Sequence, residues 1–534
     1  MQRRALLATS GLALATPALA QADTRPSLTI AVQKISNSNT LETPREQSNV
    51  GFRLSGLYAE SLIGTDWLGN LGQVPGLATA WRRVDERVVE FDLRAGVRLH
   101  DGREMTAEDV AFSLGGARLY GTGDGSTERA GGITAGQTGR EPPPDVIATA
   151  RRTFPGFEKV ELVREGVVRF INRVPDVTLE GRIAQNVGVI MSRTGFEAAA
   201  NWLAWARRPI GSGPYQVAEF RPDVSLTFEA HDAYWGGRPP ARRLRFVEMP
   251  EASSRINALF SGEVDFACDI PPDQIRTVER NRHFEALASS INNIRVLVFD
   301  KSHPVLANPL VRRALTHAID HQAIVQSLWS GRTELTRGLQ LEFFGDMYHR
   351  GWQNPRFDPA EARRLLREAG YRGEPIPYRC LNNYYVNQTP AAQVMVEMWR
   401  AVGLNVQLQM LENFSQVLEP GATRAIRDWS VTHVFSDPVG SMVRAMGPLG
   451  ELQRGREWSN AEFNTLSAEL EGSTDRVRRR AAFGRMLEII ERADPGYMVL
   501  HQAATFIAKR RDIRWRAARG WPMEFGPGNL ALGT

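Results

Sequence analysis

The chain has 534 residues, of which 42% are apolar and 23% charged, with 47 Gly and 30 Pro spread along its length. Because a domain usually holds about 150 residues, this length predicts several lobes, and the composition excludes both a small disulfide-stabilised scaffold and a disordered protein. The net charge of +5 arises from 65 basic and 60 acidic residues, a balance that does not indicate a nucleic-acid partner.

Residues 1–22 have the pattern of a cleaved export signal. Arg3 and Arg4 precede an apolar run over residues 5–15, and small residues follow at the spacing of a cleavage site. The run is about half of the ~20 apolar residues that span a bilayer, so we expect a soluble periplasmic protein. The arginine pair resembles a twin-arginine signal, and the sequence leaves that route and the general export pathway equally open.

The two cysteines limit the covalent chemistry of the chain. Neither Cys268 nor Cys380 lies near the cleavage site, so no lipid anchor is expected. In an oxidising periplasm the two cysteines either form one disulfide or remain free thiols, and the sequence does not decide between these states.

The first half of the chain begins with a β-rich run over residues 28–32, which passes into a polar string over 33–40. A strand that runs into a polar loop is a candidate wall of a ligand site, here with Asn37 and Asn39. Further strands are expected at 88–93 and 98–102, with a hairpin at 160–170. Thr106 and Asp109 predict a capping box for a helix at 107–114. The Gly-rich residues 121–144 predict a long surface loop, either an insertion or a lid.

From about residue 290 the predicted helices and strands alternate, which is typical of sheets covered by helices. Ligands in such sheets bind beyond the carboxyl ends of strands. Strands are expected at 294–299, 378–381, 406–410, 430–435 and 506–508, and helices at 308–329, 358–369, 390–402, 460–470 and 475–493. Three strand ends therefore supply candidate ligand-binding residues: Asn383, Tyr384, Tyr385, Asn413, Phe414, Phe435 and Asp437. Amide and aromatic side chains suit a polar organic solute better than a bare ion. For the two tyrosines, the alternative is that one is a core residue and the other is exposed.

No catalytic or metal-binding motif is complete. His317 and His321 lie four apart, but the residues between them are not those of a hydrolytic zinc motif. The glycines at 211–213 lack the Lys-Ser/Thr of a phosphate-binding loop. Arg478–Arg480 lie among acidic residues on a predicted helix, which favours a solvated face. We therefore expect no enzymatic activity, no metal and no cofactor.

Six segments together resemble the family 5 extracellular solute-binding proteins, the dipeptide/oligopeptide/nickel group of periplasmic components of ABC importers. They occur in family order over nearly the whole mature chain, at 90–113, 209–215, 232–237, 255–266, 308–320 and 358–371. The resemblance implies a two-lobed periplasmic-binding-protein-like α/β fold of type II, with an extra inserted subdomain in the first lobe. It places the core of lobe I at 23–52, 168–287 and 504–534, the inserted subdomain at 53–167, and lobe II at 288–503.

The resemblance further implies that the two lobes close on a peptide or peptide-like solute, which a monomer delivers to permease subunits in the inner membrane. Peptide-binding members carry an Asp that holds the α-ammonium of the peptide, at a position where this chain has Val434. Because a buried ammonium without a counter-charge costs several kcal/mol, this residue argues against a free amino terminus there. Asp437 is the alternative counter-charge or a turn residue.

The rival solutes are an opine, a sugar conjugate or a chelated metal. The rival functions are a periplasmic hydrolase and a sensory protein that docks on a membrane receptor.

Overall fold

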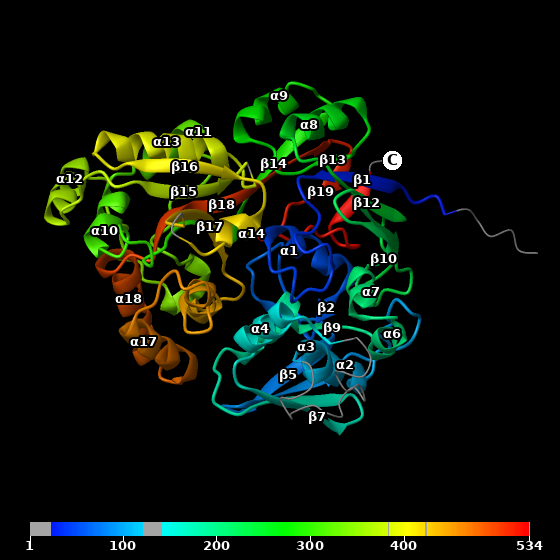
Figure 1. Cartoon of the computed structure of the whole chain (residues 1–534). Helices are drawn as coiled ribbons and strands as arrows, with labels where there is room; N and C mark the ends of the chain where they lie inside the picture. The colour runs from blue at the N-terminus through cyan, green and yellow to red at the C-terminus, as the bar shows by residue number, and fades with distance from the viewer. Residues whose placement is uncertain (1–22, 121–140, 383, 422–423, 533–534) are drawn as a thin grey trace, which may run out of the picture.

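The computed structural model describes residues 23–120, 141–382, 384–421 and 424–532, which form a mixed α/β structure of two bodies that lie side by side (Figure 1). The predicted signal sequence and most of the Gly-rich segment lie outside the described residues. Among the helices that are described, none has the length and apolar character needed to cross a bilayer.

One mixed sheet of ten strands runs through both bodies. Its strands, in spatial order, are β10 (Tyr215–Arg221), β11 (Ser225–Ala230), β12 (Arg243–Glu248), β1 (Ser27–Val32), β13 (Phe266–Ala267), β18 (Tyr497–Arg510), β14 (Phe284–Phe299), β17 (Ile426–Thr432), β15 (Ile376–Leu381) and β16 (Val406–Leu411). The strand β1 is parallel to both of its neighbours, as is β15, whereas the other pairs are antiparallel.

The long strands β14 and β18 connect the two bodies. Their pairing runs from Phe284 to Ser290 and resumes at Ile294, with a register shift between. Such an irregularity bends the strands and re-aims the residues within it. We use lobe I for residues 23–287 and 504–532, and lobe II for residues 288–503, as labels for the two bodies.

Lobe I also carries a smaller, separate sheet. The four strands β5 (Ala78–Asp85), β6 (Val88–Leu93), β8 (Val167–Asn172) and β7 (Phe157–Arg164) are antiparallel. They form a buried cluster with α2 (Ala107–Leu114) and α4 (Pro144–Thr153), and α3 (Gly116–Leu119) lies between these helices in the chain. Thr106 and Asp109 form the predicted capping box of α2. Because β8 belongs to this sheet, the subdomain extends past residue 167.

The remaining elements of lobe I are short. The helices are α1 (Asn49–Tyr58), α5 (Leu179–Ile183), η1 (Asn186–Gly188), α6 (Arg193–Ala198), α7 (Trp202–Arg207), α8 (Ala252–Ser261), η2 (Pro272–Gln274) and α9 (Ile275–Glu279). Three two-stranded sheets pair β2 (Glu60–Ser61) with β9 (Val189–Ile190), β3 (Ile63–Thr65) with β4 (Gln73–Pro75), and β19 (Ile513–Trp515) with β20 (Leu530–Leu532).

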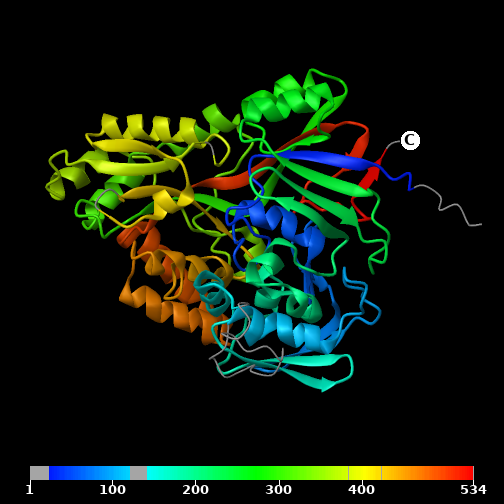
Figure 2. The ribbon, with the colours of Figure 1, turned by 45° about the vertical axis from the view of Figure 1, so that its right-hand side comes forward.

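Helices surround the sheet of lobe II. They are α10 (Pro309–His317), α11 (His321–Trp329), η3 (Glu342–Met347), α12 (Pro359–Glu368), α13 (Gln388–Ala401), α14 (Phe414–Leu418), η4 (Pro438–Gly440), α15 (Met442–Met446), α16 (Glu451–Arg454), α17 (Ala461–Gly472), α18 (Arg476–Glu488) and η5 (Ile489–Ala493). The last of these, in orange, face the blue-to-cyan part of lobe I that carries α4 (Figure 2).

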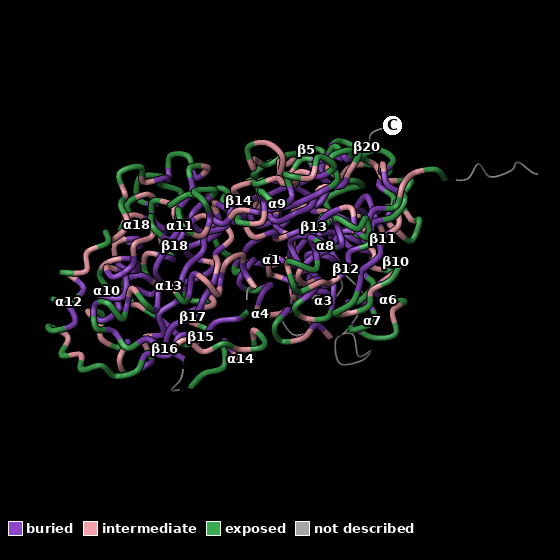
Figure 3. Tube along the Cα trace, turned by 90° about the horizontal axis from the view of Figure 1, so that it is seen from above, coloured by how far each residue is buried: buried purple, intermediate pink, exposed green. Residues whose placement is uncertain are grey.

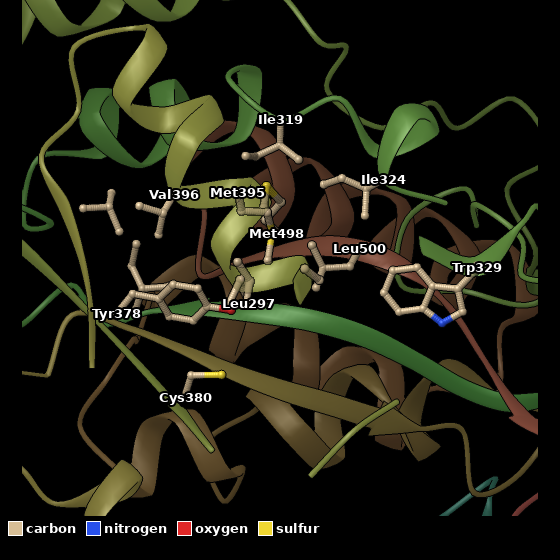
Figure 4. Close-up of a cluster of buried hydrophobic side chains, with 14 of the residues drawn as sticks. Leu297, Ile319, Ile324, Trp329, Tyr378, Cys380, Met395, Val396, Met498 and Leu500 are labelled. Carbon is tan, nitrogen blue, oxygen red and sulfur yellow. The ribbon is translucent and has the colours of Figure 1, made fainter. Parts of the chain in front are cut away.

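The buried residues follow the large sheet and the helices packed on it (Figure 3). In lobe II, Leu297 of β14, Tyr378 of β15 and Met498 of β18 pack with Met395 of α13 and Trp329 of α11 (Figure 4). Cys380 belongs to this cluster, and Cys268 lies in a different cluster of lobe I. Both cysteines are free, buried thiols, so they do not form a disulfide in this structure.

Three predicted elements differ from the structure. The helix expected at 308–329 is two helices, because Asp320 caps a new one by accepting a hydrogen bond from Ala323 N at 2.9 Å. The strand expected at 430–435 is β17, which ends at Thr432, so Val434 and Phe435 lie beyond it. Residues 98–102 form an isolated bridge between Arg98 and Glu104 and no strand.

Candidate ligand-binding site

Two cavities of similar size lie where the lobes meet. Cavity 1, of about 400 Å³, is lined mostly by lobe I and by Asn292, Thr432 and Val434 of lobe II. Cavity 2, of about 410 Å³, is lined by both lobes, including Arg255 and Asp269 of lobe I and the segment 384–387 with His501 and Ala503 of lobe II. Trp521 borders both cavities.

The helix α1 forms one wall of cavity 1. It begins after Ser48, whose side chain accepts a hydrogen bond from Gly51 N at 3.4 Å. The residues Phe52, Ser55, Gly56 and Ala59 line the cavity. The first three lie on one face of the helix, because they are three and four residues apart, and Ala59 follows its last residue. The chain then enters β2 with Glu60, which lines the same cavity.

Glu60 is held by three donors. Its Oε1 accepts a hydrogen bond from Tyr234 OH at 2.8 Å, and its Oε2 accepts hydrogen bonds from Ser212 Oγ at 2.8 Å and Trp235 Nε1 at 2.9 Å. Burial raises the pKa of the Glu60 carboxyl, while these donors and the charge of Arg94 act in the opposite direction. The orientation of this carboxyl is therefore fixed.

Glu524 is the second acid of cavity 1, and its environment differs. The hydrogen bonds and ion pairs of the described residues include none to its carboxyl oxygens, although its backbone oxygen accepts from Trp515 Nε1 at 2.8 Å. Burial, and then the charge of Glu60, raise the pKa of Glu524 to about 7. Cavity 1 thus contains one carboxyl that is fixed and one that is free to meet a solute.

Aromatic and amide side chains complete cavity 1. Trp67, Tyr234, Trp235 and Trp521 line it, and the guanidinium of Arg94 lies 4.1 Å from the centroid of the Trp235 ring. The register shift of β14 falls at Asn292, whose Nδ2 donates to the His433 carbonyl at 2.8 Å. The walls therefore offer apolar faces with a few polar tips, as in pockets for small organic solutes.

Two of the charged residues that line cavity 2, Arg295 and Asp269, already have partners. Arg295 is paired with Asp428 at 2.5 Å, and its guanidinium carbon lies 3.2 Å from the centroid of the Tyr385 ring. Asp269 is paired with Arg53 at 2.7 Å. These pairs are internal to each lobe, so they do not require a solute.

Several polar contacts join lobe I to lobe II. Arg182 pairs with Glu471 at 2.6 Å and Arg152 with Glu451 at 3.2 Å. Arg444 donates to Gln47 Oε1 at 3.2 Å. The hydroxyl of Tyr384 donates to Asn49 Oδ1 at 2.5 Å and accepts from Asn37 Nδ2 at 3.0 Å. The structure therefore has the two lobes in contact around the cavities.

The comparisons with known proteins agree with this architecture. A family model described as bacterial extracellular solute-binding proteins, family 5 Middle, matches residues 72–446. The chain belongs to this family of bacterial solute-binding proteins. It has the type II periplasmic-binding-protein fold and is a solute-binding protein of the ABC-importer type.

The relatives and solved structures are distant in sequence. Heme-binding protein A of Haemophilus influenzae is 24% identical over 462 residues, which cover 80% of this chain and 78% of the relative. The dipeptide-binding protein of Escherichia coli is 26% identical over 365 residues, 65% of this chain and 64% of the relative. The crystal structure of a dipeptide-binding protein from Pseudoalteromonas sp. SM9913 in complex with Met-Leu superposes with a TM-score of 0.82 at 20% identity, covering 95% of this chain and 100% of that one.

The predicted site residues of this solute-binding protein do not share one wall. Tyr384 and Tyr385 line cavity 2, whereas Val434 lines cavity 1. Asn37 and Asn39 are exposed in lobe I. Asn383 lies outside the described residues. The assignment of these residues to a ligand stays a prediction.

The other four predicted residues make contacts within the protein. Asn413 caps α14, and the Phe414 ring lies 6.2 Å from that of Tyr384. Phe435 is buried against lobe I, as described below. Asp437 accepts two hydrogen bonds from Arg479, both at 2.9 Å, and accepts one from Val439 N at 3.1 Å. Arg479 is 3% exposed, so the expectation that Arg478–Arg480 form a solvated face is wrong at its central residue.

Sequence reasoning missed the acids and the tryptophans of cavity 1. Tyr234 and Trp235 lie in the segment 232–237, which carries part of the family resemblance. That resemblance is the sequence feature that could have drawn attention to them. Glu60 and Glu524 have no periodic pattern around them, and they lie 464 residues apart in the chain.

The described residues contain no group of three or more His, Cys, Asp or Glu that could hold a metal ion. Burial raises the pKa of the Cys268 thiol to about 12 and also raises that of Cys380. Neither thiol is therefore a reactive thiolate at neutral pH.

Proposed function

We propose that this protein captures a polar organic solute, a peptide or a peptide-like molecule, in cavity 1 and delivers it to permease subunits in the inner membrane. In this proposal it acts as a non-enzymatic periplasmic monomer after cleavage of residues 1–22. The observation that carries the proposal is that cavity 1 has walls from both lobes, with Asn292, Thr432 and Val434 contributed by lobe II. A solute there contacts both lobes and so favours their closed arrangement.

The size and lining of cavity 1 support an organic solute. A volume of about 400 Å³ lies within the range of small-molecule pockets. Five aromatic side chains and several amides line it, which suits a molecule with both apolar and hydrogen-bonding groups. The names of the relatives, which include a dipeptide-binding protein, are consistent with a solute of this kind.

Native mass spectrometry of protein purified from the periplasm without refolding tests the proposal. We expect a retained solute whose mass is absent after denaturation. A filling variant locates the site: Gly56 faces cavity 1, and the nearest atom to a Cβ there is Glu524 Oε1 at 3.6 Å, so Gly56→Leu projects into the cavity. Ser253→Leu on α8 is the matched variant for cavity 2.

We expect Gly56→Leu to lose the retained solute and Ser253→Leu to keep it. The reverse result would place the solute in cavity 2. Retention of the solute by both variants would contradict binding in either cavity.

A further inference from the structure

The charge of cavity 1 is opposite to that of the whole chain. Of the described residues that line it, Glu60 and Glu524 are the charged ones, and none is Lys, Arg or His. The chain as a whole has a net charge of +5. A partly apolar cavity whose charges are all negative favours a positively charged solute.

The two acids differ in what they already bind. Three donors occupy the Glu60 carboxyl, whereas none of the described residues donates a hydrogen bond to the Glu524 carboxyl. An ionised carboxyl without a partner in such a cavity costs free energy, and a cation bound beside it removes that cost. Glu524 is therefore the group that gains most from a cationic solute.

Two amides of the cavity have their orientations fixed. Asn292 Nδ2 donates to the His433 carbonyl, and Asn529 Nδ2 donates to the carbonyls of Arg516 and Glu524, both at 2.9 Å. Because a carbonyl only accepts, the nitrogen of each amide must be the end that makes these bonds. The Oδ1 atoms of Asn292 and Asn529 are buried and have no partner among the described residues. Because these two oxygens have almost no accessible surface, they belong to the wall, and the carboxyl of Glu524 is the charged acceptor that the cavity offers to a solute.

The aromatic walls fit the same chemistry. Trp67, Tyr234 and Trp521 line cavity 1 together with Glu524. The face of an indole or phenol ring attracts a cation within about 6 Å of its centroid. The guanidinium carbon of Arg94 makes this kind of contact with Trp235, at 4.1 Å from the centroid of the ring. The cavity therefore combines a free carboxyl with aromatic surfaces that accept positive charge.

We propose that the transported solute carries a primary or secondary ammonium, and that Glu524 of lobe I is its counter-ion in cavity 1. This inference rests on the proposed function and names the class of its solute. It also explains how Val434 is compatible with an amine solute. The counter-charge comes from the C-terminal segment of lobe I, while the resemblance implies an Asp at position 434 in lobe II.

The test compares amines with the same molecules after acetylation. Ligand-free protein is incubated with yeast extract or with yeast extract treated with acetic anhydride, which converts amines into neutral amides. Native mass spectrometry then identifies what the protein has captured. We expect capture of amine solutes from the untreated extract and at least tenfold less of their acetylated forms from the treated extract.

The outcomes separate this inference from the proposed function. Equal capture of acetylated forms, or capture of neutral or anionic solutes alone, would overturn the cationic inference and leave solute binding in place. Capture from neither extract would contradict both proposals. These comparisons use the wild-type chain and do not depend on the folding of a variant.

Substitution of Glu524 tests the residue itself. With a captured amine as the titrant in calorimetry, we expect Glu524→Gln to weaken binding at least tenfold and Glu524→Asp to weaken it less, because the charge is kept. Glu263→Gln removes a charge from an exposed residue outside both cavities and should leave affinity unchanged. Equal affinities of the wild type and Glu524→Gln would show that Glu524 is not the counter-ion.

Discussion

The ring of Phe435 in lobe II lies directly against Gly181 in lobe I. A Cβ placed on Gly181 would be 2.8 Å from Cγ of Phe435 and 2.9 Å from its Cδ2. Gly181 is in α5, and Phe435 follows the end of β17. The absence of a side chain at residue 181 therefore permits this contact between the lobes.

Gly181→Ala should disfavour the closed arrangement of the lobes. The added methyl group overlaps a rigid ring, so either the ring or one lobe must shift. We expect the affinity for the retained solute, measured by calorimetry, to fall about tenfold, equivalent to about 1.4 kcal/mol. Gly351→Ala is the control, because a Cβ there meets nothing within 4 Å. Unchanged affinity in Gly181→Ala would mean that this contact does not limit closure.

Tyr384→Phe should weaken solute binding without lowering stability. The substitution removes the hydroxyl that bonds Asn49 and Asn37 across the lobes. A hydrogen bond contributes about 0.5–1.5 kcal/mol, so we expect up to about a tenfold loss of affinity in calorimetry. Tyr371→Phe removes a hydroxyl that bonds within lobe II and should leave affinity unchanged. Unchanged affinity in Tyr384→Phe, or a melting temperature clearly below that of the wild type, would argue against a closure role.

Tyr385→Ala should instead lower the stability of the fold. Tyr385 is 8% exposed, and Arg295 lies over its ring. Loss of a buried aromatic side chain costs about 3–5 kcal/mol of the free energy of unfolding. Chemical denaturation measures this value. If Tyr385→Ala unfolds at the wild-type denaturant concentration but loses affinity, the side chain belongs to the site and not to the core.

Asp437→Asn should destabilise lobe II. Asp437 and Arg479 are 7% and 3% exposed and share two hydrogen bonds. Breaking a buried ion pair by removing one charge costs about 3–5 kcal/mol, which chemical denaturation would detect. Asp346→Asn, which breaks the exposed pair with Arg476, should cost about 0–1 kcal/mol. Equal losses in the two variants would show that burial does not strengthen the Asp437 pair.

The stability of the ligand-free protein should depend on Glu524 and on pH. Burial and the charge of Glu60 raise the pKa of Glu524 from 4.5 to about 7. The folded state therefore binds more protons than the unfolded state between these values, and stability falls as pH rises through this window. Because Glu524→Gln lacks this loss, its melting temperature relative to the wild type should be higher at pH 8 than at pH 5. Arg94 and Tyr234, the other charged or titratable groups near this acid pair, are unchanged in the comparison.

The affinity for a cationic solute should change with pH in the opposite sense. A cation prefers the ionised Glu524 carboxyl, so binding should strengthen from pH 5 to pH 8 in the wild type. Glu524→Gln should bind with nearly the same affinity at both pH values. Calorimetry at the two pH values measures both variants, and an equally steep pH dependence in Glu524→Gln would assign the titration to another group.

Much of the fold could be predicted from local sequence signals. Thr106 and Asp109 identify the start of α2, and Asp358 followed by Pro359 marks the start of α12. Such caps act within one turn, so they can be read without tertiary contacts. The lengths of β14 and β18 could not be predicted in this way. Each crosses both lobes, and polar residues interrupt its apolar pattern at the crossing, such as Asn292 in β14 and Gln502 in β18.

The candidate site also has some residues that the sequence could indicate and others that it could not. Sequence analysis located strand ends and aromatic residues, of which Tyr384 and Tyr385 line cavity 2 and Val434 lines cavity 1. It did not find Glu524, because the residue gains its significance from the walls around it. A carboxyl becomes a candidate counter-ion through burial and through the absence of other donors, and neither can be read from its neighbours in the chain.

The sequence by itself determined the family, the α/β class and the order of most elements, since these follow from motifs, caps and hydrophobic periodicity over short stretches. Tertiary structure alone decided which residues meet across the lobes. The contact of Gly181 with Phe435, the pair of Asp437 with Arg479, and the placement of Glu60 and Glu524 in one cavity each join residues far apart in the chain. The physical reason is that packing and desolvation depend on distances in space, which a linear pattern does not contain.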